Sequence, residues 1–137
     1  MQTKDIKQKV ILPCTPQEAY DAWLDSKTHS EIIGADAAID PKVGGKFSLW
    51  DGEMLGKTIE IHPPINKIVQ EWRDNGSDWP EEYYSTITLV FHPLKNGKTE
   101  LVFTHTGIPQ EHVKDIEEGW NNFYWKPMQK YFEAKKK

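Results

Sequence analysis

Residues 110–134, QEHVKDIEEGWNNFYWKPMQKYFEA, decide the fold of this chain. Apolar side chains recur in this stretch at spacings of three and four, the period of one face of an α-helix. They are Val113, Ile116, Trp120, Phe123, Tyr124, Met128, Tyr131 and Phe132. Acidic residues lie in the first half and lysines toward the end, which suits the helix dipole. The stretch therefore predicts one long helix whose wide, aromatic-rich face must be buried.

Two residues in this stretch break the rules for a helix interior. Gly119 is a poor helix former in the middle of the apolar pattern. Pro127 has no amide hydrogen and cannot bond the carbonyl of Phe123, so we expect the helix to bend there.

The middle of the chain, residues 36–106, has the alternating pattern of β-strands. The clearest alternation is in residues 85–92, where Ile87, Leu89 and Phe91 share one face. We expect strands at residues 6–12, 37–39, 45–50, 54–62, 67–73, 85–92 and 99–106. Asn96-Gly97 predicts a hairpin turn, and Pro63-Pro64-Ile65-Asn66 predicts another break between strands. Because short connections join successive strands, we expect an antiparallel sheet.

Two capping signals predict short helices after the first strand. In Thr15-Pro16-Gln17-Glu18, the threonine can cap a helix, proline suits its first position, and the glutamate completes a capping box. A second capping box, Thr28-x-x-Glu31, predicts a short helix that Gly34 ends.

These elements predict an α+β fold in a single domain, residues 1–137. A chain of 137 residues fits one ordinary domain. The long helix and the antiparallel sheet each have an apolar side, and they can bury these sides against each other. We therefore expect a curved antiparallel sheet of about six to seven strands wrapped around the C-terminal helix. A cavity is expected wherever the packing between them is incomplete.

Composition argues against several classes of protein. The net charge is −4, and the only basic cluster is Lys135–Lys137, so we expect no nucleic-acid partner. No apolar run approaches the roughly 18 residues of a membrane span, so we expect no membrane partner. The opening MQTKDIKQKV lacks the apolar stretch of a secretory signal, which favours a cytoplasmic location. One cysteine excludes an intrachain disulfide framework and a thiolate-rich metal site.

A series of short motifs runs through nearly the whole chain in a characteristic order. They are Gly44-Gly45-Lys46-Phe47, Asp51-Gly52, Ile68-Val69-x-x-Trp72-Arg73, Trp79-Pro80, Ser85-Thr86-Ile87-Thr88-Leu89, Asn96-Gly97-Lys98-Thr99-Glu100-Leu101, Gly107-Ile108-Pro109 and Gly119-Trp120. With the predicted layout, they resemble the START-like (SRPBCC, birch-allergen-like) superfamily, which has the helix-grip fold. Within it, the chain most resembles the C-terminal domain of the activator of heat-shock protein 90 ATPase family.

This resemblance implies a non-enzymatic co-chaperone-like domain that binds a protein partner and takes part in the stress response. The implied partner is a chaperone of the heat-shock protein 90 family. In that family a further, N-terminal domain makes the main activating contact, and the sequence shows no counterpart of it, so we expect only the supporting half. The superfamily also implies two alternatives. One is a carrier or sensor of a small apolar ligand in a cavity between helix and sheet, and the other is a cavity-based enzyme of cyclase or hydrolase type.

The ligand and enzyme alternatives both require a cavity lined by aromatic side chains. The candidate lining residues are Phe47, Trp72, Phe103, His105, Trp120 and Tyr124. Alternation places His105 on the interior face near Trp120, where it could act as a general base beside a carboxylate. A hydrogen-bonded core histidine and a filled aromatic core are the simpler interpretations. The resemblance brings no agreed catalytic set, so no catalytic residue is assigned.

A surface loop is the candidate site for a protein partner. In residues 74–84, Trp79 lies among acidic residues that include Glu81 and Glu82. An exposed tryptophan in such a loop can anchor a partner, although it can also fold back onto the sheet. The histidines are scattered at residues 29, 62, 92, 105 and 112, so we expect no metal site and no cofactor.

Overall fold

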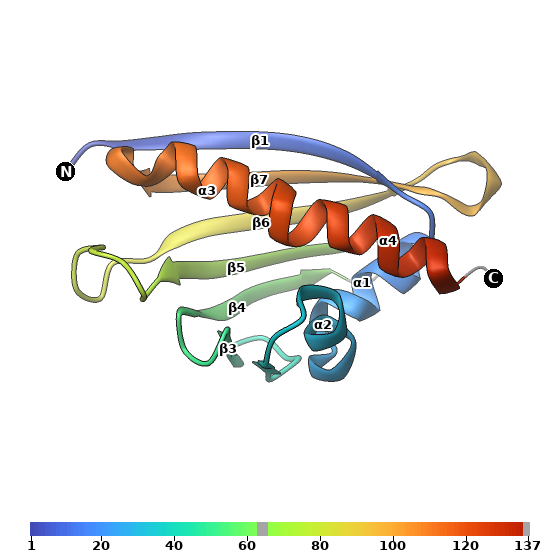
Figure 1. Cartoon of the computed structure of the whole chain (residues 1–137), viewed down its shortest axis with the longest axis horizontal. Helices are drawn as coiled ribbons and strands as arrows, with labels where there is room; N and C mark the ends of the chain where they lie inside the picture. Colours follow the sequence, from blue (N-terminus) through green and yellow to red (C-terminus); the bar gives the residue numbers. More distant parts are fainter. Residues whose placement is uncertain (63–65, 136–137) are drawn as a thin grey trace.

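A curved antiparallel sheet and a long helix lying along its concave face make up most of the computed structural model, which describes residues 1–62 and 66–135 (Figure 1). The elements follow in the order β1 (Thr3–Leu12), α1 (Pro16–Leu24), α2 (Ser26–Ile33), β2 (Ala37–Ile39), β3 (Lys46–Leu49), β4 (Met54–His62), β5 (Lys67–Asp74), β6 (Ser85–Pro93), η2 (Lys95–Gly97), β7 (Thr99–Pro109), η3 (Gln110–His112), α3 (Val113–Trp120), η4 (Asn121–Trp125) and α4 (Lys126–Lys135). The break expected at Pro63–Ile65 and the last two lysines lie outside the described residues.

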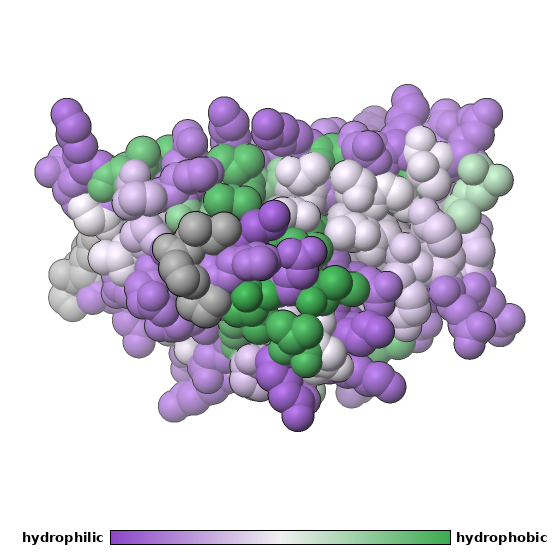
Figure 2. Space-filling model, turned by 180° about the vertical axis from the view of Figure 1, so that it is seen from behind, coloured by the Kyte–Doolittle hydropathy of each residue, from purple (hydrophilic) through white to green (hydrophobic). Residues whose placement is uncertain are grey.

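The sheet has the order β1-β7-β6-β5-β4-β3-β2 within the part of the chain that the structure describes. Every neighbouring pair is antiparallel, and β1 returns to pair with β7. The alternation in β6 is as expected, since Ile87, Leu89 and Phe91 are buried while Thr86 and Thr88 are half-buried on the other face. Seen from behind, the molecule shows this outer face as mostly polar, with apolar residues gathered near its centre and at a few other places (Figure 2). The predicted α+β helix-grip fold is therefore confirmed.

The C-terminal helix contains a wider turn just before Pro127. In η4 the turn is π-helical, and the amide of Lys126 donates to the carbonyl of Asn121, five residues earlier. In a regular α-helix the ring of Pro127 would clash with the carbonyl of Phe123, and the wider turn avoids this clash. The turn also changes which side chains face the sheet. Phe123, expected in the buried face, is 59% exposed, whereas Trp125, which the spacing did not select, is 3% exposed.

The first short helix begins as predicted and the second does not. Thr15 and Glu18 form the expected capping box of α1. Helix α2 starts earlier than expected, because the carboxylate of Asp25 accepts the backbone amide of Thr28 at 2.9 Å and takes the capping position. The prediction that Thr28 caps this helix is therefore wrong. Gly34 ends the helix with a positive φ of 68°, as expected.

Strand β7 continues through Gly107-Ile108-Pro109, where the sequence predicted only the break before the helix. The first residues of β1 extend the pairing, with Thr3 opposite Pro109 and Lys4 opposite Ile108. The carboxylate of Asp5 also accepts the amide of Gly107 at 2.9 Å. The paired end of β7 is therefore separated from the long helix only by the 3-10 turn η3.

Gly56 allows strands β3 and β4 to pack closely. It lies opposite Phe47 in the ladder, and a Cβ at this position would overlap the Phe47 ring and the carbonyl oxygen of Glu71. Because the Glu71 oxygen belongs to the backbone of β5, it cannot move aside without disturbing the sheet.

We therefore expect Gly56→Ala to lower the free energy of unfolding by at least about 2 kcal/mol, because the added methyl group forces the strands apart. Urea denaturation measures the change. The matched control is Gly76→Ala, since a Cβ there would meet its nearest atoms at 3.4–3.5 Å, an ordinary contact. Equal stabilities for the two variants would show that the close approach at Gly56 has no structural role.

Candidate functional site

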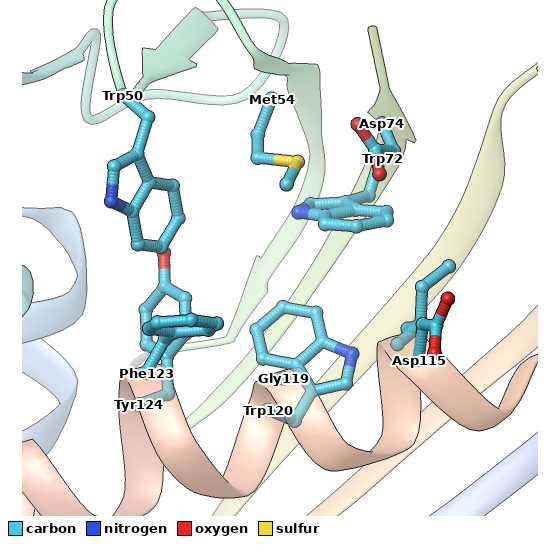
Figure 3. Close-up of a pocket in the computed structure, with 10 residues that line it drawn as sticks. Trp50, Met54, Trp72, Asp74, Asp115, Gly119, Trp120, Phe123 and Tyr124 are labelled. Carbon is cyan, nitrogen blue, oxygen red and sulfur yellow. The ribbon is translucent and has the colours of Figure 1, made fainter. Parts of the chain in front are cut away.

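A pocket of about 200 Å³ lies between the C-terminal helix and the β3–β5 side of the sheet (Figure 3). Its walls are mainly aromatic and apolar. The lining residues are Trp50, Met54, Trp72, Asp74, Asp115, Ile116, Gly119, Trp120, Phe123 and Tyr124. The sheet contributes the first four of these from β4, β5 and the β3–β4 turn, and the helix contributes the others from α3 and η4.

Two departures from regular backbone form the rim of this pocket. Trp50 has a φ of 49°, in the left-handed region that bulky side chains rarely adopt. Its indole meets the ring of Phe123 edge to face, with 6.2 Å between ring centroids. Phe123 belongs to the π turn and is 59% exposed. The rim is therefore built by the same turn that accommodates Pro127.

Polar groups in the pocket are few. Asp74 and Asp115 lie beside Trp72 and Trp120, away from Trp50 (Figure 3). One oxygen of Asp74 accepts the amide of Gly76 at 3.1 Å, which holds this carboxylate in place. The indole nitrogen of Trp72 is buried and has no hydrogen-bond partner.

Trp72, Trp120 and Tyr124, three of the candidate cavity residues, line this pocket. Phe47 instead lies over Gly56 and beside a void of only about 10 Å³ deeper in the core. Phe103 packs between Trp120 and Trp125, with centroid distances of 4.5 and 4.9 Å. For these two phenylalanines, the filled-core interpretation describes the structure better than a cavity does.

His105, the remaining cavity candidate, is fully buried and fully hydrogen-bonded. The indole of Trp120 donates to its Nδ1 at 3.0 Å, so the proton of the neutral ring is on Nε2. Nε2 donates to Ser85 Oγ at 2.7 Å, and this hydroxyl donates to the carbonyl of Trp72 at 2.7 Å. Burial lowers the pKa of His105 to about 3. With both nitrogens engaged inside the core, His105 is a structural histidine and not an available general base.

His29, which the sequence did not single out, forms a second buried chain. Its Nδ1 donates to the carbonyl of Trp23 at 2.9 Å, so Nε2 accepts the hydroxyl of Tyr124 at 2.8 Å. Burial lowers the pKa of His29 to about 4, although the bond to Trp23 acts in the opposite direction. Burial also raises the pKa of Tyr124 well above its ordinary value. One sequence signal could have indicated that His29 is buried: it lies three positions before the apolar Ile32, on the same face of α2.

Trp79 is 5% exposed, so of the two arrangements that the sequence left open, it folds back and is not an exposed anchor. Its ring packs against Trp72 and Tyr83, with centroid distances of 5.7 and 6.1 Å. The loop folds back because Arg73 donates to the carbonyls of Pro80 and Tyr83, at 2.8 and 3.2 Å. The tryptophan therefore supports the loop from within.

The acidic residues of this loop do face solvent. Glu81 and Glu82 are exposed. Asp78 is also exposed, and one of its oxygens lies 2.6 Å from Nε2 of His112. Together Asp78, Glu81 and Glu82 form an acidic surface, which we call the acidic loop, on a base held by Arg73.

Residues 1–62 and 66–135 contain no group of three His, Cys, Asp or Glu side chains that could hold a metal ion. No helix among them has the length and hydropathy of a membrane span.

The family model described as Activator of Hsp90 ATPase homolog 1-like protein matches residues 13–133. The chain belongs to this family. The activator of 90 kDa heat shock protein ATPase homolog 1 of Homo sapiens is 32% identical over 130 residues, which are 95% of this chain and 37% of the human protein. The Dictyostelium discoideum homolog is 34% identical over 119 residues, which are 86% of this chain and 30% of that protein. The chain thus spans between 30% and 37% of the length of these curated relatives.

Solved structures agree with the activator family and with its fold. The crystal structure of an HSP90 activator from Plasmodium falciparum has 34% identity and a TM-score of 0.77, covering 87% of this chain and 89% of that one. The structure of Ara h 8.0201 has a TM-score of 0.76 and covers 97% of this chain and 99% of that one. Its identity is only 13%, so this second likeness concerns the fold alone.

The two buried histidines predict that this activator-family domain loses stability in mild acid. In the unfolded chain each histidine titrates near 6.5, whereas in the folded chain His29 and His105 titrate near 4 and 3. Between these values only the unfolded state binds the protons, so acid favours unfolding. We expect the free energy of unfolding to fall as the pH drops from about 6.5 to about 4, by up to about 1.4 kcal/mol per pH unit for each histidine. Urea denaturation across this range measures the slope.

The variant His29→Phe tests whether His29 contributes to this pH dependence of stability. The variant leaves the Trp23 carbonyl and the Tyr124 hydroxyl unpaired, so it is less stable at pH 7, but its pH slope should be smaller by up to about 1.4 kcal/mol per pH unit. His92 is exposed, and His92→Gln should retain the parent slope. An unchanged slope in His29→Phe would contradict the assignment.

Proposed function

We propose that this domain acts as a non-enzymatic co-chaperone module that binds a chaperone of the heat-shock protein 90 family. The observation that carries the proposal is the family match over residues 13–133, together with identities above 30% to activators of that chaperone's ATPase. Because the chain spans only part of those relatives, we propose binding as its primary activity and stimulation of the ATPase as a consequence to be measured. A cytoplasmic location and a role in the stress response belong to the same proposal.

The acidic loop supports this proposal as the contact surface. Its carboxylates at Asp78, Glu81 and Glu82 are exposed, while Arg73 and the buried Trp79 hold the backbone beneath them. A loop whose backbone is already held by such contacts loses less conformational freedom on binding, and its charge can guide a basic surface of a partner into register. Such a surface needs no exposed tryptophan.

The sequence also suggested a cavity-based enzyme and a carrier or sensor of a small apolar ligand, and the structure bears differently on these two alternatives. The candidate base of the enzyme alternative, His105, is engaged on both nitrogens, and we do not propose that alternative further. The ligand alternative is supported by the pocket of about 200 Å³ between helix and sheet. It is compatible with chaperone binding, because the pocket and the acidic loop use different exposed residues.

A binding assay with a heat-shock protein 90 chaperone tests the proposed function. We expect the domain to bind at micromolar concentration and to change the ATPase rate of the chaperone. The double variant Glu81→Lys and Glu82→Lys should weaken binding about tenfold, since it reverses the charge of the acidic loop. The control Glu133→Lys reverses an exposed charge on α4 and should bind within about twofold of the parent.

The outcomes test chaperone binding and the role of the acidic loop separately. Absence of both binding and any rate change at tens of micromolar would remove the proposed function. Binding that is equally strong in the loop variant and in the control would remove the acidic loop as the contact surface.

A further inference from the structure

The pocket between α3, η4 and the sheet is walled by aromatic rings. Trp50, Trp72, Trp120, Phe123 and Tyr124 all contribute to its lining. The faces of aromatic rings carry negative potential and attract organic cations, most strongly when the rings are tryptophans and the site is partly desolvated. An aromatic wall is also compatible with a neutral apolar ligand, so the charge of the pocket must decide between the two.

The charged side chains of the lining are both negative. Asp74 and Asp115 face the same pocket from opposite sides, one from β5 and the other from α3 (Figure 3). No lysine or arginine is among the described lining residues that could neutralise them. Aromatic rings together with unneutralised carboxylates favour a ligand that carries a positive charge.

The indole N–H of Trp72 adds a second requirement. This nitrogen is buried and has no partner, and its side chain is only 4% exposed. In Figure 3 it points toward the space between Trp50 and Trp120, and the thioether end of Met54 lies toward it. A buried donor without an acceptor is unfavourable, whereas methionine is flexible and readily changes its rotamer. A ligand acceptor that displaces Met54 would therefore give Trp72 its missing hydrogen bond.

The volume limits the size of the ligand. The pocket holds about 200 Å³, somewhat more than the ~150 Å³ cavity that accepts one benzene molecule. A single ring with short substituents fits this space, and a long acyl chain or a sterol does not.

We propose that this pocket binds a small organic cation with one ring-sized apolar group and one hydrogen-bond acceptor. The ammonium group lies near Asp74 and Asp115, and the apolar group packs between Trp50, Trp120 and Phe123. The acceptor takes the N–H of Trp72 after Met54 moves aside. This site goes beyond the proposed chaperone contact, because it uses a different surface and a different class of ligand.

Three simple probes separate the parts of this proposal. The compound 4-(aminomethyl)benzamide has a ring, an ammonium group and an amide oxygen, whereas benzylamine lacks the acceptor and 4-methylbenzamide lacks the charge. Nitrogen-15 NMR of the whole chain follows the indole N–H groups of its six tryptophans. Trp72→Phe, which keeps an aromatic ring, identifies the signal of Trp72 by its loss. We expect 4-(aminomethyl)benzamide to shift that signal downfield in a saturable way and to bind more tightly than either analogue.

Substitutions then test the two carboxylates. The double variant Asp74→Asn and Asp115→Asn should weaken binding of 4-(aminomethyl)benzamide at least about tenfold and leave 4-methylbenzamide unchanged. An asparagine at position 74 can still accept the Gly76 amide, so the turn is retained. The control Glu133→Gln removes an exposed carboxylate elsewhere on the helix and should have no effect.

Either of two results would overturn the proposal. One is that the neutral 4-methylbenzamide binds as tightly as the charged 4-(aminomethyl)benzamide, which would show that the pocket has no preference for a cation. The other is that none of the probes shifts the Trp72 signal at about 10 mM. Neither result depends on a chaperone, so failure here and failure of the proposed function are distinguishable.

Discussion

The indole of Trp120 joins the long helix to the sheet, and the rest of the core is arranged around it. Its ring packs against Phe103 of β7 at 4.5 Å and Trp72 of β5 at 5.4 Å, measured between centroids. Its N–H donates to His105, whose other nitrogen reaches Ser85 of β6. One side chain of the helix therefore contacts β5 and β7 directly and is linked to β6 through His105, and its polar atom is satisfied in the core. A helix displaced from this position would leave a buried histidine without its donor.

The π turn in the helix links packing to the candidate ligand site. It accommodates Pro127 and brings Trp125 into the core, where the indole of Trp125 donates to the side chain of Gln8 on β1 at 2.7 Å. The same turn places Phe123 over the pocket opposite Trp50. Single-turn π segments often occur at functional sites. Here the physical reason is that Pro127 requires a wider turn, and this turn shifts the positions of the side chains around the helix. As a result Trp125 fills the core and Phe123 forms part of the pocket rim.

Local patterns predicted the fold well and the site less well. The alternation at residues 85–92 and the capping box at Thr15 act over a few residues, so the sequence shows them directly. The burial of Trp79 depends on Arg73, which bonds carbonyls that only the folded loop brings near. Likewise, the exchange between Phe123 and Trp125 follows from a turn type that helical spacing does not include.

The pairing of β1 with β7 has a consequence for folding during translation. Residues 3–12 are synthesised before the rest of this domain, but their strand partners are residues 99–109, more than 85 positions later. At ordinary rates of translation, the first strand must wait of the order of ten seconds before its partner exists. During that time its backbone groups are open to pairing with other chains. Strand β1 contains lysines at positions 4, 7 and 9. Their positive charge opposes pairing with other chains until β7 has been made and can pair with β1.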